Sequence, residues 1–404
     1  MNGSLTLCLE VIFWFALFVV FYTYLGYGIV LYILVKLKEL FVKPVKYSLP
    51  ASNDELPEVT LFITAFNEED VVDEKMENSL DLDYPADKLR IVWVTDGSDD
   101  GTNERLQTRW AGKATVHFQP LRQGKTAAMT RGMTLVDTPL VVFTDAHTTV
   151  NREAIREIVL AFRNPKVGCV AGEKRIAVQA KDGAAAGGEG IYWKYESTLK
   201  ALDARLYSAV GAAGELFAVR RELFETMEPD TLLDDFILSL RITMKGYIIA
   251  YCTNAYAIEN GSADMREEEK RKVRIAAGGL QSIRRLRPLL NPFRYGVLSF
   301  QYTSHRVLRW SVTPFLLFAL LPLNVAILLT GGSPVFYGVL FVLQVFFYGL
   351  GYWGYYLSTR QIKNKLLFIP YYFLFMNINV LRGIRYLKKK RGSGTWEKAK
   401  RAEK

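Results

Sequence analysis

The chain contains the stretch LRIVWVTDGSDDGT at residues 89–102, in which an apolar, β-branched run stops at a cluster of aspartates and glycines. Such a run is typical of a buried strand, and Asp, Gly and Ser are residues that favour turns. Similar apolar runs occur at residues 57–66, 114–119 and 140–144. We therefore predict four buried strands in this part of the chain.

Helical stretches separate the predicted strands and follow the last of them, at residues 68–81, 102–112, 125–136 and 151–163. Strands and helices that alternate in this way predict an α/β fold with a mostly parallel, Rossmann-like sheet and helices on both faces. Ligands of such sheets bind beyond the carboxyl ends of the strands. Residues 183–190, GAAAGGEG, are small and are expected to form a flexible loop.

The two ends of the chain are much more apolar than its middle. Residues 8–37 form one apolar run, long enough for a membrane span of about 20 residues, and lysines follow it on a flank that the positive-inside rule assigns to the cytosol. Residues 311–330 and 334–357 predict two further spans. Residues 366–383 are less apolar, and a fourth span and an interfacial helix both remain open.

The net charge of +10 is concentrated near the C-terminus, where residues 381–404 hold ten lysines and arginines against two glutamates. Next to an apolar segment this predicts a cytosolic, lipid-facing tail and no nucleic-acid partner. Residues 280–309 interleave arginines with apolar residues, which favours helices at the membrane interface over a basic surface of the soluble domain. The three scattered cysteines predict neither disulfides nor a zinc site.

These patterns divide the chain into five predicted parts. They are an N-terminal transmembrane helix (1–37), a cytosolic domain (38–279), amphipathic interfacial helices (280–309), a C-terminal transmembrane region (310–384) and a basic cytosolic tail (385–404).

Polar residues at the predicted strand ends are candidates for binding. Asp96 could accept a hydrogen bond from a nucleotide base, or it could form the turn that caps the next helix. Lys125 follows a glycine at a predicted helix start, a position that suits a phosphate. Asp145 and His147 lie on the same side of a strand end, so both could reach one cation, and manganese suits this pair better than magnesium.

Two further motifs lie later in the chain. Asp234 and Asp235 precede an apolar helix, where they could be caps or could provide a general base that removes a proton from a hydroxyl. Arg271 and Arg274 share one face of a predicted helix and could hold a diphosphate, although a solvated charge run would look the same.

Taken in order, N-E-E after the first strand, D-G-S-x-D-G-T after the second, G-K before the fourth, D-x-H at its end, then D-D and R-x-x-R resemble glycosyltransferase family two. The resemblance runs from about residue 57 to residue 274. Within the family, the sequence is similar to the membrane branch that includes cellulose, hyaluronan and poly-N-acetylglucosamine synthases. Within that branch, residues 211–224 and 304–310 resemble a bacterial subgroup often left without an assigned substrate.

The resemblance implies a GT-A-type fold, a divalent metal cofactor (magnesium or manganese) and a nucleotide-sugar donor. It also implies a role for each matching residue. These are contact with the uridine for Asp96, proximity to the diphosphate for Asp145, metal ligation for His147, the general base for Asp235, support of the diphosphate for Arg274, and lining of the nucleotide pocket for Asn67, Glu68 and Lys125.

The sequence departs from the family pattern at two places. His147 stands where the family has the last aspartate of D-x-D. The Q-x-x-R-W signature of processive synthases is replaced by the residues from Arg271 to Ile275, so the tryptophan that stacks on the acceptor sugar is missing. Trp193 and Tyr195 are candidates for that acceptor role.

We therefore expect an inverting membrane glycosyltransferase that moves a sugar, from UDP by resemblance, to a glycan or lipid-linked acceptor in cell-surface polysaccharide synthesis. The expected location is the inner (plasma) membrane, with several spans, contacts to membrane lipids and the catalytic domain in the cytosol. The alternatives are a polyprenyl-phosphate glycosyltransferase and a non-catalytic membrane scaffold with a degenerate transferase domain.

Overall fold

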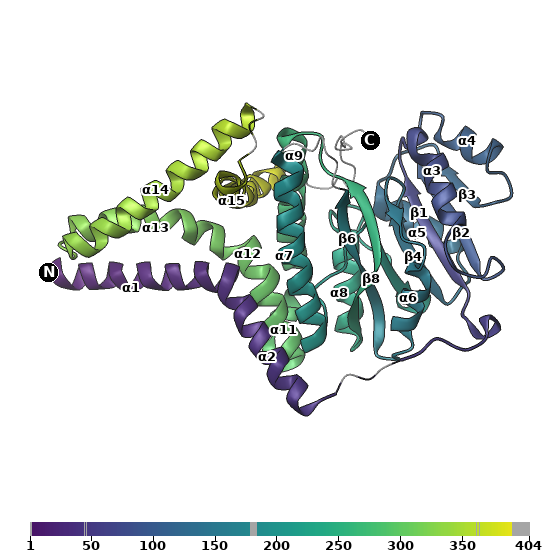
Figure 1. Ribbon diagram of the computed structural model, residues 1–404, viewed down its shortest axis with the longest axis horizontal. Coiled ribbons are helices and arrows are strands. Elements are labelled where there is room, and N and C mark those ends of the chain that lie inside the picture. The colour runs from purple at the N-terminus through teal and green to yellow at the C-terminus, as the bar shows by residue number, and fades with distance from the viewer. Residues whose placement is uncertain are drawn as a thin grey trace.

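The computed structural model describes residues 2–43, 45, 47–177, 184–360, 362 and 364–389. Figure 1 shows the sheet with its helices on the right and long helices that extend to the left, with α7 (Ala184–Leu206) and α9 (Met265–Arg285) between them. The greater part of the basic tail predicted at 385–404 lies outside the described residues.

The strands are β1 (Val59–Ala65), β2 (Leu89–Asp96), β3 (Thr115–Gln119), β4 (Leu140–Asp145), β5 (Thr149–Val150), β6 (Val167–Ala177), β7 (Leu216–Arg220) and β8 (Ile248–Asn260). The helices that accompany them are α3 (Glu69–Leu80), α4 (Thr102–Thr108), α5 (Lys125–Gly132), α6 (Ala154–Phe162), α7 (Ala184–Leu206), α8 (Asp234–Met244) and α9 (Met265–Arg285), with short 3₁₀ turns η2 (Asn53–Glu55), η3 (Met133–Leu135) and η4 (Arg221–Leu223).

The remaining helices are α1 (Asn2–Phe21), the π-helix η1 (Tyr22–Gly26), α2 (Tyr27–Phe41), the 3₁₀ turn η5 (Arg287–Leu290), α10 (Pro292–Tyr295), α11 (Val297–Tyr302), the π-helix η6 (Thr303–Val307), α12 (Leu308–Trp310), α13 (Val312–Leu329), α14 (Pro334–Thr359) and α15 (Lys365–Lys389).

Within the described residues the strands form one eight-stranded sheet, in the order β3-β2-β1-β4-β7-β6-β8-β5. The four predicted strands are β1 to β4, and all three pairings among them are parallel. This confirms the predicted α/β fold with a mostly parallel sheet. Strand β7 runs antiparallel to both β4 and β6 and so joins the two halves of the sheet.

Alternating side chains of the strands supply two separate cores. Leu61 and Ile63 of β1 belong to a core that includes residues of α3, α4 and α6. Phe62, between them, belongs to a second core that includes residues of α5 and α8, and Trp310 of α12 also reaches this core. The parallel strands are therefore covered on both faces. This packing holds the strands in place, and with them the sheet edge at which their carboxyl ends meet.

The predicted loop at residues 183–190 is wrong over the described part, because residues 184–190 form the first turns of α7. Ala184, Ala185 and Ala186 begin this helix, and alanine is the residue with the most favourable helix propensity. The alanines and the continuous 23-residue helix outweigh the cost of the glycines that follow.

Four helical segments in the described residues are long and apolar enough to cross a membrane, namely Gly3–Phe41, Val312–Leu329, Pro334–Thr359 and Leu366–Lys389. The first has 39 residues. At 1.5 Å per residue it is about 58 Å long, roughly twice the thickness of the hydrocarbon core. It bends near η1, and its second half, α2, lies beside α7 (Figure 1).

The contact between α2 and α7 ties the first apolar helix to the sheet domain. Tyr27, Leu31 and Val35 of α2 form a buried cluster with Leu199 and Leu202 of α7. The last candidate span, α15, packs along α14 and also along α9 of the sheet domain. The apolar helices and the sheet domain therefore share continuous packing.

Not all arginines of the segment 280–309 face the surface, as a purely interfacial segment would require. Phe293 and Arg294 are exposed at the tip of this segment. Arg306 and Arg309, by contrast, are each only 7% exposed and point into the protein. Their partner is Glu196 of α7, at 2.6 Å from Arg306 and 2.9 Å from Arg309.

Gly211 allows a close approach behind the predicted catalytic helix. Its φ is +89°, and an added Cβ would lie 2.2 Å from the ring of Phe236. We expect Gly211→Ala to cost about 1–2 kcal/mol in left-handed backbone and about 1–3 kcal/mol in overpacking, and so to lower the apparent Tm in detergent. Gly246→Ala is the matched control, since Gly246 has φ +94° and open space for a Cβ. An equal fall in Tm in the two variants would show that the contact with the Phe236 ring adds nothing to the cost of Gly211→Ala.

Candidate active site

A large cavity lies between the carboxyl edge of the sheet and the apolar helices. Its volume is about 1050 Å³, and its lining includes Asp96, Lys125, Asp145, His147 and Asp235. These residues come from β2, α5, β4, the turn after β4 and α8. Parallel strands place their carboxyl ends at one edge of a sheet, which explains why motifs far apart in the sequence meet here.

Lys125 connects the D-x-H motif with the D-D motif. Its Nζ lies 2.8 Å from Asp145 Oδ1 and 3.8 Å from Asp234 Oδ2. Burial alone would lower the pKa of Lys125, but the carboxylates of Asp145 and Asp234 outweigh it and raise that pKa. Lys125 is therefore a fixed positive charge at the sheet edge. An anion bound there could replace its carboxylate partners, or could share the ammonium group with them.

Asp235 faces the same small space as Lys125. Gly214 marks that space, because a Cβ added there would lie 3.2 Å from Lys125 Nζ and 3.6 Å from Asp235 Oδ2. Burial, and then the neighbouring charge of Asp234, raises the pKa of Asp235 above its usual range. A carboxylate with a raised pKa is a stronger base than an ordinary surface aspartate.

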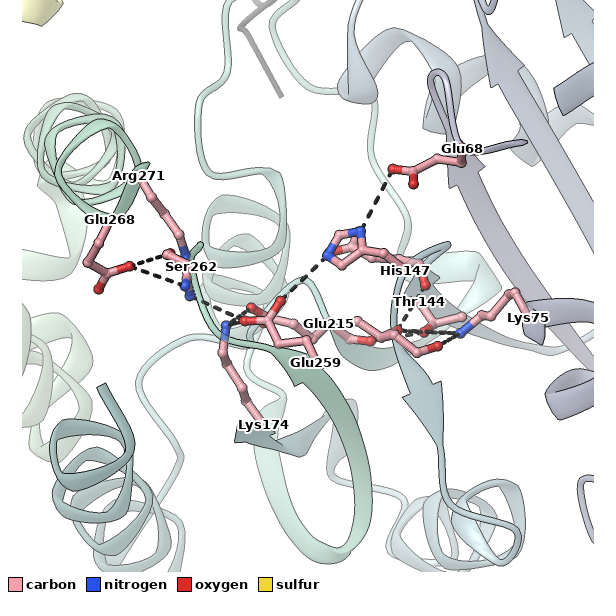
Figure 2. A network of polar contacts seen from close by, with 12 residues as sticks. Glu68, Lys75, Thr144, His147, Lys174, Glu215, Glu259, Ser262, Glu268 and Arg271 are labelled. Atoms are coloured by element: carbon pink, nitrogen blue, oxygen red, sulfur yellow. Dashed lines mark hydrogen bonds and ion pairs between the residues drawn. The ribbon is translucent and has the colours of Figure 1, made fainter. Parts of the chain in front are cut away.

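His147 lies between two carboxylates, as Figure 2 shows. Its Nδ1 lies 3.8 Å from Glu68 Oε1, and its Nε2 lies 3.5 Å from Glu259 Oε2. Glu259 is in turn paired with Lys174 and lies 3.4 Å from Arg271. The imidazole is thus held by a charged network that reaches from β1 to α9.

A divalent metal is implied by the resemblance, and the residues present can be compared with its needs. A metal site completed by protein ligands alone would need at least three His, Cys, Asp or Glu side chains close together. Within the described part of the chain there is no such group. Asp145 and His147 nevertheless line the same cavity. A pair of this kind suits a cation that takes its other ligands from water and a diphosphate. On this ground the two residues fit a metal bound together with a nucleotide.

Asp96 lines the cavity, yet the chain itself uses both oxygens of its carboxylate. The backbone N–H groups of Gln123 and Gly124 donate to Oδ2 at 2.9 and 2.6 Å, and Arg131 donates to Oδ1 at 2.5 Å. Asp96 therefore fixes the loop before Lys125, and its contact with a uridine stays a prediction.

Glu68 lines the cavity, whereas Asn67 is not among the lining residues. The Asn67 amide pairs with Asp99 instead, donating to its carboxylate at 2.6 Å and accepting from its backbone N–H at 3.1 Å. Among the described residues Asn67 is the one non-glycine with a positive φ, +52°. Asn67 therefore joins the loops after β1 and β2, and its predicted place in the lining of a nucleotide pocket stays a prediction.

Several lining residues were missed by the sequence reasoning. The Arg122 guanidinium lies 3.6 Å from the centre of the Phe66 ring, and both line the cavity beside Asp96. Phe66 is the last residue of a predicted strand, so its position at a strand end was a usable signal. Glu215 and its partner Lys174, 2.5 Å apart, gave no such signal, since neither follows one of the four predicted strands.

The remaining candidates also line the cavity. Arg274 is half-buried there, whereas Arg271 is buried and pairs with Glu259 and Glu268. Trp193 is surrounded by the ammonium groups of three lysines, at 4.7 Å, 6.0 Å and 5.7 Å from its ring. Tyr195 lines the cavity, and its hydroxyl donates to the backbone oxygen of Tyr24 at 2.5 Å.

Comparison with known proteins gives consistent relatives. A family model described as "Glycosyltransferase like family 2" matches residues 57–278. The chain is 27% identical over 247 residues to the probable glycosyltransferase YdaM of Bacillus subtilis, which covers 55% of this chain and 56% of the relative. It is 26% identical over 224 residues to a poly-beta-1,6-N-acetyl-D-glucosamine synthase of Staphylococcus aureus, with 52% and 53% covered. The chain thus spans about half the length of these curated relatives.

A solved structure resembles nearly the whole chain. It is the mannosyltransferase PcManGT from Pyrobaculum calidifontis, in complex with GDP-Man and Mn²⁺, with a TM-score of 0.69 and 20% sequence identity. The match covers 95% of this chain and 99% of that one. At this identity the likeness shows the fold, which includes the apolar helices as well as the sheet domain.

Proposed function

Since the chain belongs to the glycosyltransferase-like family 2, we propose that it transfers one sugar from a nucleotide-sugar to an acceptor at a membrane, with inversion at the anomeric carbon. The chain is a glycosyltransferase by its family and relatives. The observation that carries the proposal is that Lys125, Asp145 and Asp235 meet around Gly214 in one cavity.

In the proposed mechanism, the donor's nucleoside lies beside Phe66, Asp96 and Arg122, and its diphosphate reaches Lys125. The positive charges of Lys125 and Arg274 stabilise the negative charge that develops on the leaving nucleoside diphosphate. The acceptor oxygen attacks the anomeric carbon as the bond to the diphosphate breaks. The proton of an acceptor hydroxyl passes to a carboxylate oxygen of Asp235.

Asp145 and His147 are the residues that would hold a divalent metal, magnesium or manganese, close to the diphosphate. Such an ion, when bound, supplies further positive charge to the leaving group. The charged network around His147 keeps the imidazole in place from two sides, through Glu68 and Glu259. We place the enzyme in the inner membrane, with the four apolar segments as spans or interfacial helices and the sheet domain in the cytosol.

Release of nucleoside diphosphate by the purified protein in lipid nanodiscs tests the proposal. A panel of UDP- and GDP-sugars, each with magnesium or manganese and with lipid and glycan acceptors, would identify the donor. Release from one donor, dependent on an acceptor, supports the proposed transfer. The proposal fails if folded protein in membranes releases no nucleoside diphosphate from any donor.

The raised pKa of Asp235 predicts the acid side of the pH profile. A general base works only when deprotonated, so kcat/KM should fall at a higher pH than an ordinary aspartate, with a pKa of about 3.9, would allow. Asp234→Asn removes a negative charge that raises the pKa of Asp235, so this variant should shift the fall to lower pH. The profile is measured by diphosphate release between about pH 5 and pH 8. An unchanged acid limb in Asp234→Asn would contradict the assignment.

A further inference from the structure

The cavity changes character along its length. Its lining near the sheet edge is charged, whereas its far end is apolar and is formed by Val20 of α1, Leu25 of η1, Leu350 of α14, and Ile369 and Phe373 of α15. Its volume of about 1050 Å³ is at the upper end of the roughly 300–1,000 Å³ that ligand pockets usually have, and the apolar end adds to the charged end that a nucleotide-sugar would use. The cavity therefore offers room for an apolar chain beyond the nucleotide-sugar.

The apolar end is open at the side of the protein. Leu366 at the start of α15 lines the cavity and is 81% exposed, and Leu25 on η1 lines it and is also exposed. Both belong to candidate membrane spans. Tyr24 of η1 contacts Phe373 and Asn377 of α15, so a molecule with a long apolar chain would enter from the membrane beside this contact, at Leu25 and Leu366, without leaving an apolar environment.

A cluster of positive charges lies between the two ends of the cavity. It consists of Lys200 of α7, Arg306 of η6 and Arg309 of α12, all three lining the cavity and nearly buried. The carboxylate that faces them is Glu196, which pairs with both arginines and lies 3.3 Å from His305. Glu215 and Asp235 also attract Lys200, but burial and the charge of Arg306 outweigh all three carboxylates in their effect on the pKa of Lys200.

Lys200 is the residue that points most directly to a ligand. It is 5% exposed, and among the described residues its ammonium has no hydrogen bond or ion pair, although it lies 6.0 Å from the rings of Trp193 and Tyr251. Burying an ammonium without an anionic partner is costly. Burial and the charge of Arg306 lower the pKa of Lys200, and a bound anion would reverse that shift.

The cluster is also close to the predicted catalytic base. Asp235 is one of the carboxylates whose charge acts on Lys200, and both side chains line the same cavity as Arg306 and Lys125. An anion bound at Arg306 and Lys200 would therefore hold the oxygen next to it near Asp235 and Lys125.

We propose that the acceptor is a phosphate-bearing lipid, with its phosphate bound by Lys200, Arg306 and Arg309 and its apolar chain along η1, α14 and α15. The inference rests on the proposed function and names the acceptor class of the same site. The oxygen that attacks the anomeric carbon belongs either to this phosphate or to a sugar hydroxyl linked to it. In the second case its proton passes to Asp235, and in both cases the nucleoside diphosphate leaves with the electron pair of the broken bond.

Binding of farnesyl phosphate to the protein in detergent, followed by native mass spectrometry, tests this proposal. Farnesol, which lacks the phosphate, and glycerol phosphate, which lacks the apolar chain, are the ligand controls. Lys200→Gln should bind farnesyl phosphate about 10- to 100-fold more weakly, because it loses a charged hydrogen bond. Arg294→Gln, the same charge change on the exposed tip of segment 280–309, should bind normally.

The outcomes separate the two proposals. Equal binding of farnesol and farnesyl phosphate, equal binding of glycerol phosphate, or normal binding by Lys200→Gln would each overturn the lipid phosphate site. Binding of farnesyl phosphate with the expected loss in Lys200→Gln supports it, even if the same protein binds no nucleoside diphosphate. That last result would count against the proposed transfer reaction alone.

The product distinguishes the two possible accepting oxygens. Mild acid cleaves the bond between a sugar and the phosphate, so a sugar attached to the phosphate itself is released as a monosaccharide, whereas a sugar attached to a sugar hydroxyl is released joined to that first sugar, as an oligosaccharide. Transfer to farnesyl phosphate identifies the phosphate oxygen, and transfer only to a lipid diphosphate that already carries a sugar identifies the hydroxyl. A product found only in the aqueous phase, on a lipid-free glycan, would overturn the inference.

Discussion

Replacing Asp235 with asparagine is expected to lower turnover by roughly 10²–10⁴ while nucleotide binding is largely retained. The amide has almost the same size as the carboxylate but cannot take the proton of an acceptor hydroxyl. Asp235 faces the small space at Gly214. The proposed nucleoside contacts lie elsewhere in the lining, Phe66 at the end of β1 and Arg122 before α5, so the substitution should not disturb them. Diphosphate release gives the turnover, and nucleotide titration gives the binding.

Asp230→Asn is the control for this experiment. Asp230 lies just before α8, pairs with Arg285 at 2.5 Å and is not among the residues that line the cavity. It should lose little turnover, because it contacts neither substrate nor reacting atoms. Near-normal turnover of a well-folded Asp235→Asn variant would remove Asp235 from its proposed role.

A lipid phosphate acceptor gives this prediction a second use. If the attacking oxygen belongs to the phosphate, it carries no proton at neutral pH, and the loss in Asp235→Asn should be at the small end of the range. If it belongs to a sugar hydroxyl, the loss should be at the large end. The size of the effect therefore reports on the accepting oxygen.

The part of the fold that could be predicted from the sequence is the part that depends on local pattern. Strands β1 to β4 are apolar runs that stop at turn residues, and their parallel order follows from the helices between them. Asp96, Asp145 and Lys125 could be found for the same reason, since they directly follow a strand or begin a helix. Their meeting at one edge is a consequence of parallel topology.

The rest depends on contacts between distant segments. Strand β7 lies between β4 and β6 and is antiparallel to both, and no local pattern in residues 216–220 indicates that order. His147 lies between Glu68 and Glu259, although 112 residues separate His147 from Glu259 in the sequence. The sequence left open whether Asp96 contacts a base or forms a turn, and its hydrogen bonds with Arg131 and two backbone amides could not be seen in that pattern.

The segment at 280–309 shows the limit most clearly. Its arginines alternate with apolar residues, which is a pattern that lipid-facing helices and buried ion pairs share. Arg306 and Arg309 are buried because Glu196, more than a hundred residues earlier on α7, provides the opposite charge. A pattern within the segment cannot reveal a partner outside it.

Replacing Glu196 with glutamine should therefore destabilise the protein strongly. Glu196 is 1% exposed, and removing its charge leaves Arg306 and Arg309 buried without the anion that neutralises them. Breaking a buried ion pair in this way costs about 3–5 kcal/mol. We expect a large fall in the apparent Tm, measured by intrinsic fluorescence in nanodiscs.

Glu228→Gln is the matched control, because Glu228 pairs with Arg241 at 2.7 Å but is largely exposed, and such surface pairs contribute only about 0–1 kcal/mol. Equal Tm values for the two variants would show that Arg306 and Arg309 are not held by Glu196.

If the cluster binds a lipid phosphate, farnesyl phosphate should raise the Tm of Glu196→Gln by more than that of the unchanged protein, because the added anion then replaces the missing carboxylate. Since Glu196 lies on α7 and the two arginines on the segment that leads into α13, the same contact joins the sheet domain to the apolar helices. Loss of this contact should first destabilise the proposed acceptor side of the cavity, while nucleotide binding at β1 and β4 persists.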